Sequence, residues 1–143
     1  MSTSDLQHVL EQYQRSLDAF VQGDSEFAKT LFSRRDDVTL ANPFGPPARG
    51  WGQVEQAMED AASQIREGEP TRFELISSYE TSELAYTLEI ERVRAKVGGS
   101  AEMGEISLRV TTVFRREDGE WKIVHRHADP ITSPRRPGSI LQQ

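Results

Sequence analysis

The residues best suited to chemistry lie near the C-terminus, in the run FRREDGEWKIVHRHADP (residues 114–130). Its EDGE segment separates two apolar runs and predicts the turn of a β-hairpin. Beyond the turn, His125 and His127 continue the alternation begun by Trp121 and Ile123, so a period of two predicts that all four share one face of a strand. If that face is covered, the two histidines line an interior. Imidazoles there could transfer protons or meet an anionic or carbonyl-bearing ligand.

Two further polar groups extend this pattern. Asp129 ends the histidine row and could orient a histidine or act as a base itself, and Arg109 on the preceding predicted strand could stabilise developing negative charge. His125, His127 and Asp129 also alternate as two-histidine, one-carboxylate metal ligands do. Residues along one strand seldom converge on one ion, however, so no metal site is predicted. The histidines could equally be structural, hydrogen-bonded to neighbouring strands.

Length and composition limit the class of protein. A chain of 143 residues predicts one domain, here residues 1–130, followed by a polar, proline-containing tail at 131–143. The formal charge of −6 argues against a nucleic-acid surface, and no apolar run reaches the roughly 20 residues that span a bilayer. The polar N-terminus is unlike a signal peptide, so we expect a cytoplasmic protein. Without cysteine there are no disulfides, thiolate nucleophiles or cysteine-ligated metals.

Hydrophobic periodicity predicts three helices followed by an antiparallel meander. A capping-box pattern at Ser4 begins a long amphipathic helix that ends at Gly23, and Asp24 caps a short second helix. The remaining predicted elements are a strand at 38–41, a rigid loop at 42–50, a helix at 50–67, and strands at 71–79, 84–97, 102–116 and 120–129. Glu89 and Glu91, close to arginines, are interpreted as surface charges.

This order predicts an α+β fold in which the three helices pack in the concave face of a curled antiparallel sheet and leave a conical cavity. The order and lengths, with Leu84-Ala85-Tyr86, Asn42-Pro43-Phe44-Gly45 and the final hairpin, resemble the nuclear transport factor-like, ketosteroid-isomerase-like superfamily and its SnoaL-like branch. The hairpin also resembles the association domain of calcium/calmodulin-dependent protein kinase. The resemblance covers roughly Leu6 to Pro130 and implies a cystatin-like cone in which Tyr86 and Thr111 face the pocket.

The resemblance does not extend to the steroid isomerase mechanism, which uses a tyrosine on the first helix and two aspartates. Tyr13 lies about one turn further from the helix end than that tyrosine. The position of the base is occupied by Asn42, whose amide cannot accept a proton at neutral pH, and the second acid falls near Thr111 or Thr112. Steroid isomerisation by two aspartates is therefore disfavoured.

We expect a small-molecule pocket protein that catalyses proton transfer without a cofactor, as an isomerase, cyclase or dehydratase. His127 or Asp129 would act as base, with His125 beside them, and Arg109 or Tyr86 would stabilise negative charge. The expected pocket walls are Tyr13, Phe44, Trp51, Tyr86 and Thr111, although each aromatic residue could instead belong to the core. The alternative is a non-catalytic ligand-binding or oligomerisation module. The expected partners are a small molecule and a second copy of the chain, with no nucleic acid, membrane, cofactor or metal.

Overall fold

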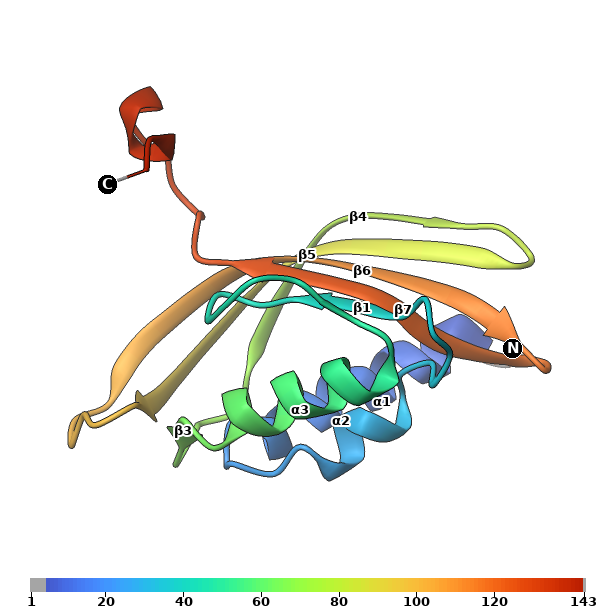
Figure 1. Ribbon diagram of the computed structural model, residues 1–143, viewed down its shortest axis with the longest axis horizontal. Helices are drawn as coiled ribbons and strands as arrows, with labels where there is room; N and C mark the ends of the chain where they lie inside the picture. Colours follow the sequence, from blue (N-terminus) through green and yellow to red (C-terminus); the bar gives the residue numbers. More distant parts are fainter. Residues whose placement is uncertain (1–4, 143) are drawn as a thin grey trace.

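The computed structural model describes residues 5–142, in which three helices lie on one side of a strongly curled sheet (Figure 1). The helices are α1 (Asp5–Phe20), α2 (Glu26–Thr30) and α3 (Trp51–Ala62), and a short 3-10 helix spans Pro137–Ile140. The strands are β1 (Thr39–Ala41), β2 (Ala48–Arg49), β3 (Ile65–Arg66), β4 (Arg72–Glu80), β5 (Leu84–Val97), β6 (Gly104–Glu117) and β7 (Glu120–Asp129). The helices cover the concave face, whereas none covers the convex face.

The sheet confirms the expected α+β cone and adds one parallel pair. Its strand order is β2-β1-β7-β6-β5-β3, and β4 also pairs with β5. All neighbours are antiparallel except β1 and β7, which run parallel with Leu40 opposite Arg126. The sheet is therefore mixed rather than wholly antiparallel. The long strands β5, β6 and β7 form its centre and carry most of the concave surface.

The first and third helices both end earlier than expected, α1 at Phe20 rather than at Gly23. The third helix ends at Ala62 rather than near residue 67, because Ile65 and Arg66 leave it to pair with Val97 and Lys96 of β5. The helix cap expected at Ser4 lies outside the described residues. None of the helices within residues 5–142 is long and apolar enough to cross a bilayer.

The core forms where the apolar side of α1 meets the concave face. Leu6, Val9 and Tyr13 recur at helical spacing and are buried, and the sheet places the fully buried Phe114 and Ile123 on the concave side. Burying each large apolar side chain contributes about 1.5–3 kcal/mol. The amphipathic period of α1 thus decides which face of the sheet becomes the interior.

A β-bulge in β7 reverses the expected orientation of the two histidines. Phe114 pairs with Ile123 but the adjacent Val113 pairs with His125, so Val124 is the extra residue on β7. Before the bulge Ile123 faces the interior; after it the interior position passes to Arg126, while His125 and His127 pair with outward residues of β6. The prediction that the histidines share a face with Trp121 and Ile123 is wrong, because one inserted residue breaks the period of two.

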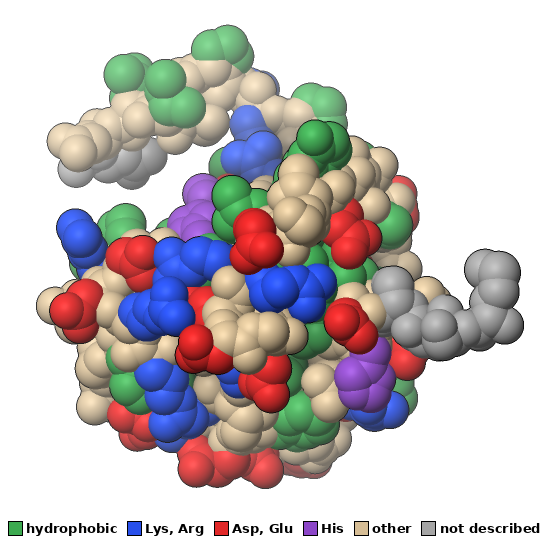
Figure 2. All heavy atoms as spheres, turned by 90° about the vertical axis from the view of Figure 1, so that its right-hand side faces the viewer, with side chains coloured by type: hydrophobic (Ala, Val, Ile, Leu, Met, Phe, Trp, Pro, Cys, Tyr) green, Lys and Arg blue, Asp and Glu red, His purple; other side chains and the backbone are tan. Residues whose placement is uncertain are grey.

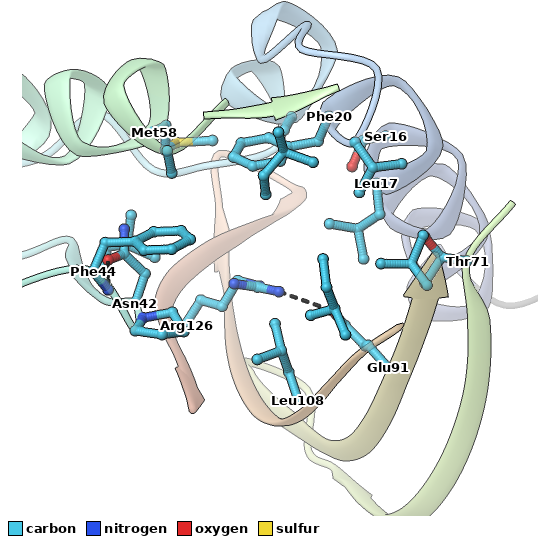
Figure 3. Close-up of a pocket in the computed structure, with 18 of the residues that line it drawn as sticks. Ser16, Leu17, Phe20, Asn42, Phe44, Met58, Thr71, Glu91, Leu108 and Arg126 are labelled. Carbon is cyan, nitrogen blue, oxygen red and sulfur yellow. Dashed lines mark hydrogen bonds and ion pairs between the residues drawn. The ribbon is translucent and has the colours of Figure 1, made fainter. Parts of the chain in front are cut away.

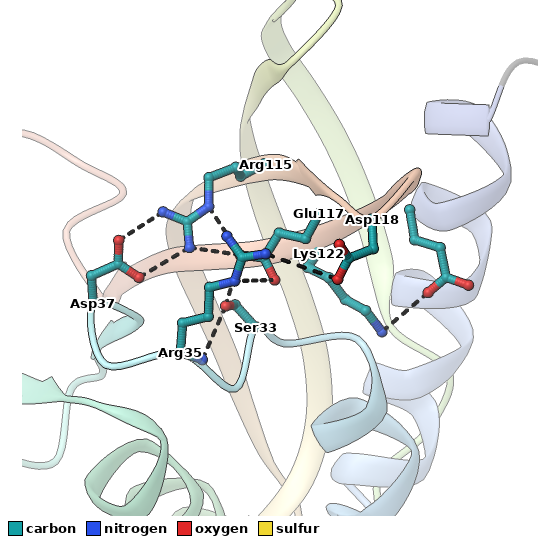
Figure 4. A network of polar contacts seen from close by, with 8 residues as sticks. Ser33, Arg35, Asp37, Arg115, Glu117, Asp118 and Lys122 are labelled. Carbon is teal, nitrogen blue, oxygen red and sulfur yellow. Dashed lines mark hydrogen bonds and ion pairs between the residues drawn. The ribbon is translucent and has the colours of Figure 1, made fainter.

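A network of ion pairs joins the β6–β7 hairpin to the segment before β1 (Figure 4). The Arg115 guanidinium donates to both carboxylate oxygens of Asp37, at 2.7 and 3.0 Å, and to Glu117 Oε2 at 2.6 Å. Ser33 Oγ donates to the same Glu117 oxygen at 2.9 Å. Glu117 is buried, so this network fixes the hairpin to the segment before β1.

Gly68 is expected to be intolerant of any side chain. Its N–H donates to the Val21 carbonyl oxygen at 3.0 Å, and an added Cβ would overlap the Val21 side chain and lie 2.8 Å from that oxygen. Gly68→Ala should therefore lower the free energy of unfolding by about 1–3 kcal/mol, as measured by urea denaturation. Gly99→Ala is the control, because a Cβ there meets nothing within 4 Å. Equal stability of the two variants would contradict this account.

Figure 2 shows the end of the molecule where the β4–β5 and β6–β7 turns lie. Acidic and basic side chains are interspersed over this face and do not gather into a patch of one sign. Residues 131–142 are exposed and leave the body on the side away from the helices (Figure 1). The division into a domain at 1–130 and a tail at 131–143 stays a prediction.

Candidate functional site

A cavity of about 260 Å³ opens between the helices and the concave face of the sheet (Figure 3). Apolar side chains form most of its wall, among them Leu17, Phe20, Met58, Val93 and Leu108. Its polar lining comes from Tyr13, Ser16, Asn42, Thr71, Glu91 and Arg126. A mostly apolar hollow with a few convergent polar groups is the usual form of a small-molecule site.

Three of these polar groups form one hydrogen-bonded network in the cavity wall. The Tyr13 hydroxyl of α1 donates to Glu91 Oε2 of β5 at 2.7 Å. Arg126 of β7 donates from Nε to the Tyr13 oxygen at 2.9 Å and from Nη2 to Glu91 Oε1 at 2.8 Å. Three elements distant in sequence therefore meet at one point. The guanidinium points into the cavity, as Figure 3 shows.

The network has defined charges at neutral pH. Burial raises the pKa of Tyr13 well above its ordinary value, which keeps the hydroxyl protonated as a donor. Burial alone would lower the pKa of Arg126, but Tyr13 and Glu91 more than offset this effect and raise it. Arg126 therefore remains a cation, and Glu91 is its hydrogen-bonded carboxylate partner. The pair brings no large net charge to the cavity.

Arg126 retains donors that the protein does not use. A guanidinium carries five N–H groups. Only Nε and Nη2 of Arg126 donate to other described residues, and its side chain is 14% exposed, at the cavity wall. Nη1 is thus available to an acceptor oxygen inside the cavity. It is the strongest polar contact that the wall offers to a ligand.

Glu89, the inward neighbour of Glu91 on β5, is also buried. Burial, and secondarily the charge of Glu91, raises the pKa of Glu89 to about 7, although Arg126 partly counteracts them. Glu89 makes no hydrogen bond or ion pair with the described residues. The interpretation of Glu89 and Glu91 as surface charges is wrong. Alternation indicated the wrong face here, because the opposite face of β5 carries Tyr86, Leu88 and Ile90 and is the more apolar of the two.

The four residues expected to be catalytic cluster on the convex face instead. Asp129 accepts a hydrogen bond from Arg109 Nε at 2.7 Å, and its second oxygen lies 3.3 Å from His127 Nε2. His125 Nδ1 lies 2.8 Å from the Thr39 hydroxyl. The structure thus brings Arg109, His127 and Asp129 together, as expected, but none of the four lines the cavity. Their catalytic role stays a prediction.

Neighbouring groups on the convex face shift the pKa values of His125 and Asp129. Burial, with the neighbouring His127, lowers the pKa of His125. Burial opposes ionisation of Asp129, but the hydrogen bonds from Arg109 and the Ile131 N–H outweigh it and hold the pKa of Asp129 below its usual range. Asp129 is accordingly an anion paired with Arg109, which suits it to orienting His127. No group of three or more histidine, aspartate or glutamate side chains within residues 5–142 could hold a metal ion.

The five expected pocket residues divide between the two faces. Tyr13 and Phe44 line the cavity. Tyr86 lies on the convex face with its ring stacked on that of Tyr79, 6.4 Å between centroids, and Thr111 pairs there with His127. The expected inward orientation of Tyr86 and Thr111 is wrong. Trp51 packs against the core at the start of α3, beneath the Arg34 guanidinium 4.5 Å from its ring centroid.

Comparison with solved structures shows the fold. A ketosteroid isomerase-like protein from Erwinia carotovora has a TM-score of 0.74 at 13% identity, covering 92% of this chain and all of its own. A candidate dehydratase of the NTF2-like family from Streptomyces avermitilis has a TM-score of 0.68 at 21% identity, covering 90% and 95%. A candidate calcium/calmodulin-dependent protein kinase type II association domain from Thiobacillus denitrificans has a TM-score of 0.69 at 17% identity, covering 86% and 92%.

Sequence comparison identifies the family more narrowly. No curated protein matches the chain. The model of the SnoaL-like domain family matches residues 9–132, which include α1 from Val9 onward, α2, α3 and all seven strands. The resemblance carried by the final hairpin and the loop at Asn42 is confirmed, and the chain belongs to the SnoaL-like domain family.

Proposed function

We propose that the cavity binds a small, neutral, largely apolar molecule whose oxygen accepts a hydrogen bond from Arg126. The observation that carries this proposal is the unused Nη1 group of Arg126 at the wall of an apolar cavity of about 260 Å³. Membership of the SnoaL-like family supports a small-molecule-binding domain. The volume lies near the lower end of the roughly 300–1,000 Å³ of typical ligand pockets, which favours a compact ligand.

The charge of the site favours a neutral ligand over an anion. Glu91 already compensates Arg126, with 2.8 Å between Oε1 and Nη2. A second carboxylate would have to lose its hydration in an apolar cavity and compete with Glu91 for the same cation. A carbonyl or hydroxyl oxygen needs only one donor, which Nη1 supplies. The preferred ligand therefore carries a polar oxygen on an otherwise apolar skeleton.

Proton-transfer chemistry on such a ligand is the reaction class that fits these groups. Arg126 would stabilise negative charge developing on the ligand oxygen, and the carboxyl of Glu91, which lines the same cavity, would accept or return the proton. Asn42 lines the same cavity but its amide cannot act as that base. The relatives named as a ketosteroid isomerase-like protein and a candidate dehydratase support this class. An enzymatic role for His127 or Asp129 would require a substrate on the convex face.

Filling the cavity should abolish ligand binding. We expect Leu108→Trp to weaken binding of the neutral fluorescent probe 2-naphthol at least about tenfold, because an indole would occupy the space beside Glu91. Leu88→Trp is the matched control, since Leu88 lies on the convex face of the neighbouring strand. Fluorescence titration measures both. Equal affinities in native protein and Leu108→Trp would contradict the proposed site.

The same variants locate any catalysis. Isomerisation of unsaturated ketones, followed by ultraviolet absorbance, should be lost in Leu108→Trp and retained in His127→Ala if the reaction occurs in the cavity. The opposite result would place the reaction on the convex face beside Asp129. Absence of turnover in native protein, with 2-naphthol still bound, would leave a binding protein without catalysis.

Self-association is the second candidate function, and exposed apolar side chains on the convex face favour it. Ile76, Tyr79 and Leu84 are at least half exposed, at 51%, 63% and 50%, and no helix covers them. Monomeric proteins rarely leave such a surface open to water. We propose that this face pairs with a second copy of the chain. The relative named as a candidate kinase association domain supports an assembling role.

A charge on the convex face should separate the copies. We expect Leu84→Glu to shift the protein from dimer to monomer in analytical ultracentrifugation, because a buried, unpaired carboxylate opposes association. Gln56→Glu adds the same charge on the exposed side of α3 and should leave the dimer intact. A native protein that sediments as a monomer at micromolar concentrations would rule out the dimer.

A further inference from the structure

Three buried polar side chains lie side by side on the concave face without partners. Thr87 of β5 and Thr112 of β6 are directly opposite each other, and both are at most 1% exposed. Neither hydroxyl makes a hydrogen bond in the described structure. Glu89, two residues beyond Thr87 on the same face, is 5% exposed and makes no hydrogen bond or ion pair within residues 5–142, although its carboxylate oxygens, unlike the two hydroxyls, keep some contact with solvent. Strand geometry places such neighbours about 5–8 Å apart, close enough to share one bridging molecule.

Leaving these groups unpaired would be costly. A buried polar group without a partner costs about 1–3 kcal/mol, and native proteins usually satisfy such groups through ordered water. Each of the two hydroxyls can both donate and accept a hydrogen bond, and a protonated carboxyl can do the same. The occupant that matches all three must itself donate and accept. Water meets this requirement and is the smallest molecule that does.

We propose that Thr87, Thr112 and Glu89 form a second internal site, which holds an ordered water molecule and gives the interior a carboxyl that exchanges its proton. This inference is independent of the ligand proposed for the cavity. Glu91 is engaged at both oxygens, by Tyr13 and by Arg126. Glu89 is a carboxyl on this face that no other group within residues 5–142 holds by a hydrogen bond, and the water connects it to the two hydroxyls.

The charged groups around Glu89 determine the pH at which its carboxyl loses the proton. The charged groups that act on it are Glu91 on its own strand and Arg126 on β7, and α1 contributes the neutral Tyr13 hydroxyl to their network. Burial and Glu91 raise the pKa of Glu89 to about 7, and Arg126 lowers it. Donation from the bridging water also favours the carboxylate. Loss of that water should raise the pKa further.

Two measurements on the ligand-free protein test the water site. Nuclear Overhauser effects should connect a long-lived water to the methyl groups of Thr87 and Thr112 in native protein. Carbon-13 titration of the Glu89 carboxyl should give a midpoint near 7. In Thr87→Val this midpoint should rise by about half a unit, and the melting temperature should fall by about 2–6 °C. Thr87→Ser keeps the hydroxyl and should restore the native midpoint.

A control variant on the convex face and the behaviour expected of a dry site complete the test. Thr111→Val changes a hydroxyl on the convex face of β6 and should leave the Glu89 midpoint unchanged. A dry site makes the opposite prediction, because replacing an unpaired buried hydroxyl by a methyl group is neutral or stabilising. The proposal is overturned if Thr87→Val and Thr112→Val melt at or above the native temperature with an unchanged Glu89 midpoint. Absence of the water signals in native protein would overturn it without any variant.

Discussion

Arg126→Met is expected to lower the free energy of unfolding by about 3–5 kcal/mol, because it leaves the buried Glu91 carboxylate without its cation. Arg126 donates to Glu91 Oε1 at 2.8 Å and to the Tyr13 oxygen at 2.9 Å, and both acceptors are buried. Because Glu91 is buried, water can do little to replace the hydrogen bond that its carboxylate loses with Arg126. Urea denaturation at pH 7, followed by tryptophan fluorescence, measures the change.

The paired variant distinguishes a lost interaction from a damaged fold. Arg126→Met combined with Glu91→Leu removes both charges and should recover most of the stability, since apolar replacements of a buried ion pair are often neutral or stabilising. If the losses of the two single variants simply add in the double variant, Arg126 and Glu91 are not coupled. The network would then not be the centre of the site.

The second large effect is a loss of stability as the pH rises from about 4.5 to about 7. The pKa of Glu89 is 4.5 in its ordinary state and about 7 in the folded protein, so the folded state binds the proton more tightly. The stabilisation is fully present below the unfolded pKa and is lost as the pH rises through the folded pKa. We expect the loss to be about 2 kcal/mol, allowing for solvent screening.

Glu89→Gln isolates this contribution. The amide cannot ionise, so the variant should lack the decline and should exceed the native protein in stability at pH 8. The contribution of His125 to the free energy of unfolding changes in the opposite direction over the same pH range. Its pKa is lowered in the folded protein, so protonation below pH 6.5 destabilises the fold. The difference between native and Glu89→Gln curves, measured by urea denaturation from pH 5 to 8, removes the histidine effect. Parallel curves would show that Glu89 is not the titrating group.

Much of the fold could be predicted from the sequence because periodicity and turn residues are local signals. The amphipathic spacing in α1 identified the buried Leu6, Val9 and Tyr13, and the EDGE turn identified the β6–β7 hairpin. The short strand β3 was missed because Ile65 continues the helical stripe of α3. Only its pairing with Val97 makes it a strand.

The site was predicted less well, for two physical reasons. A bulge is invisible to a rule of alternation when the extra residue is as apolar as its neighbour, and Ile123 and Val124 are such a pair. On β5 both faces carry apolar side chains, so the pattern did not show whether the face that holds Glu89 and Glu91 turns inward or outward. Tyr13 lines the cavity from the buried side of α1 and Phe44 from the loop between β1 and β2, and their contact with a ligand stays a prediction.

Val124 also determines which chemistry is available to the interior. With the bulge, Arg126 lies opposite the inward Thr112. If β7 instead paired regularly from Ile123 onward, Val124 would lie opposite Val113, and His125 and His127 would turn inward. The rest of the sheet would keep its register up to Phe114. The place of the bulge along β7, rather than the number of residues, therefore decides whether the interior receives titratable imidazoles or a fixed positive charge, because a chain without Val124 would pair regularly and keep Arg126 inward. A bulge placed beyond His127 instead would turn both imidazoles inward and Arg126 outward, so the same scaffold and sequence would present the interior of a different reaction class.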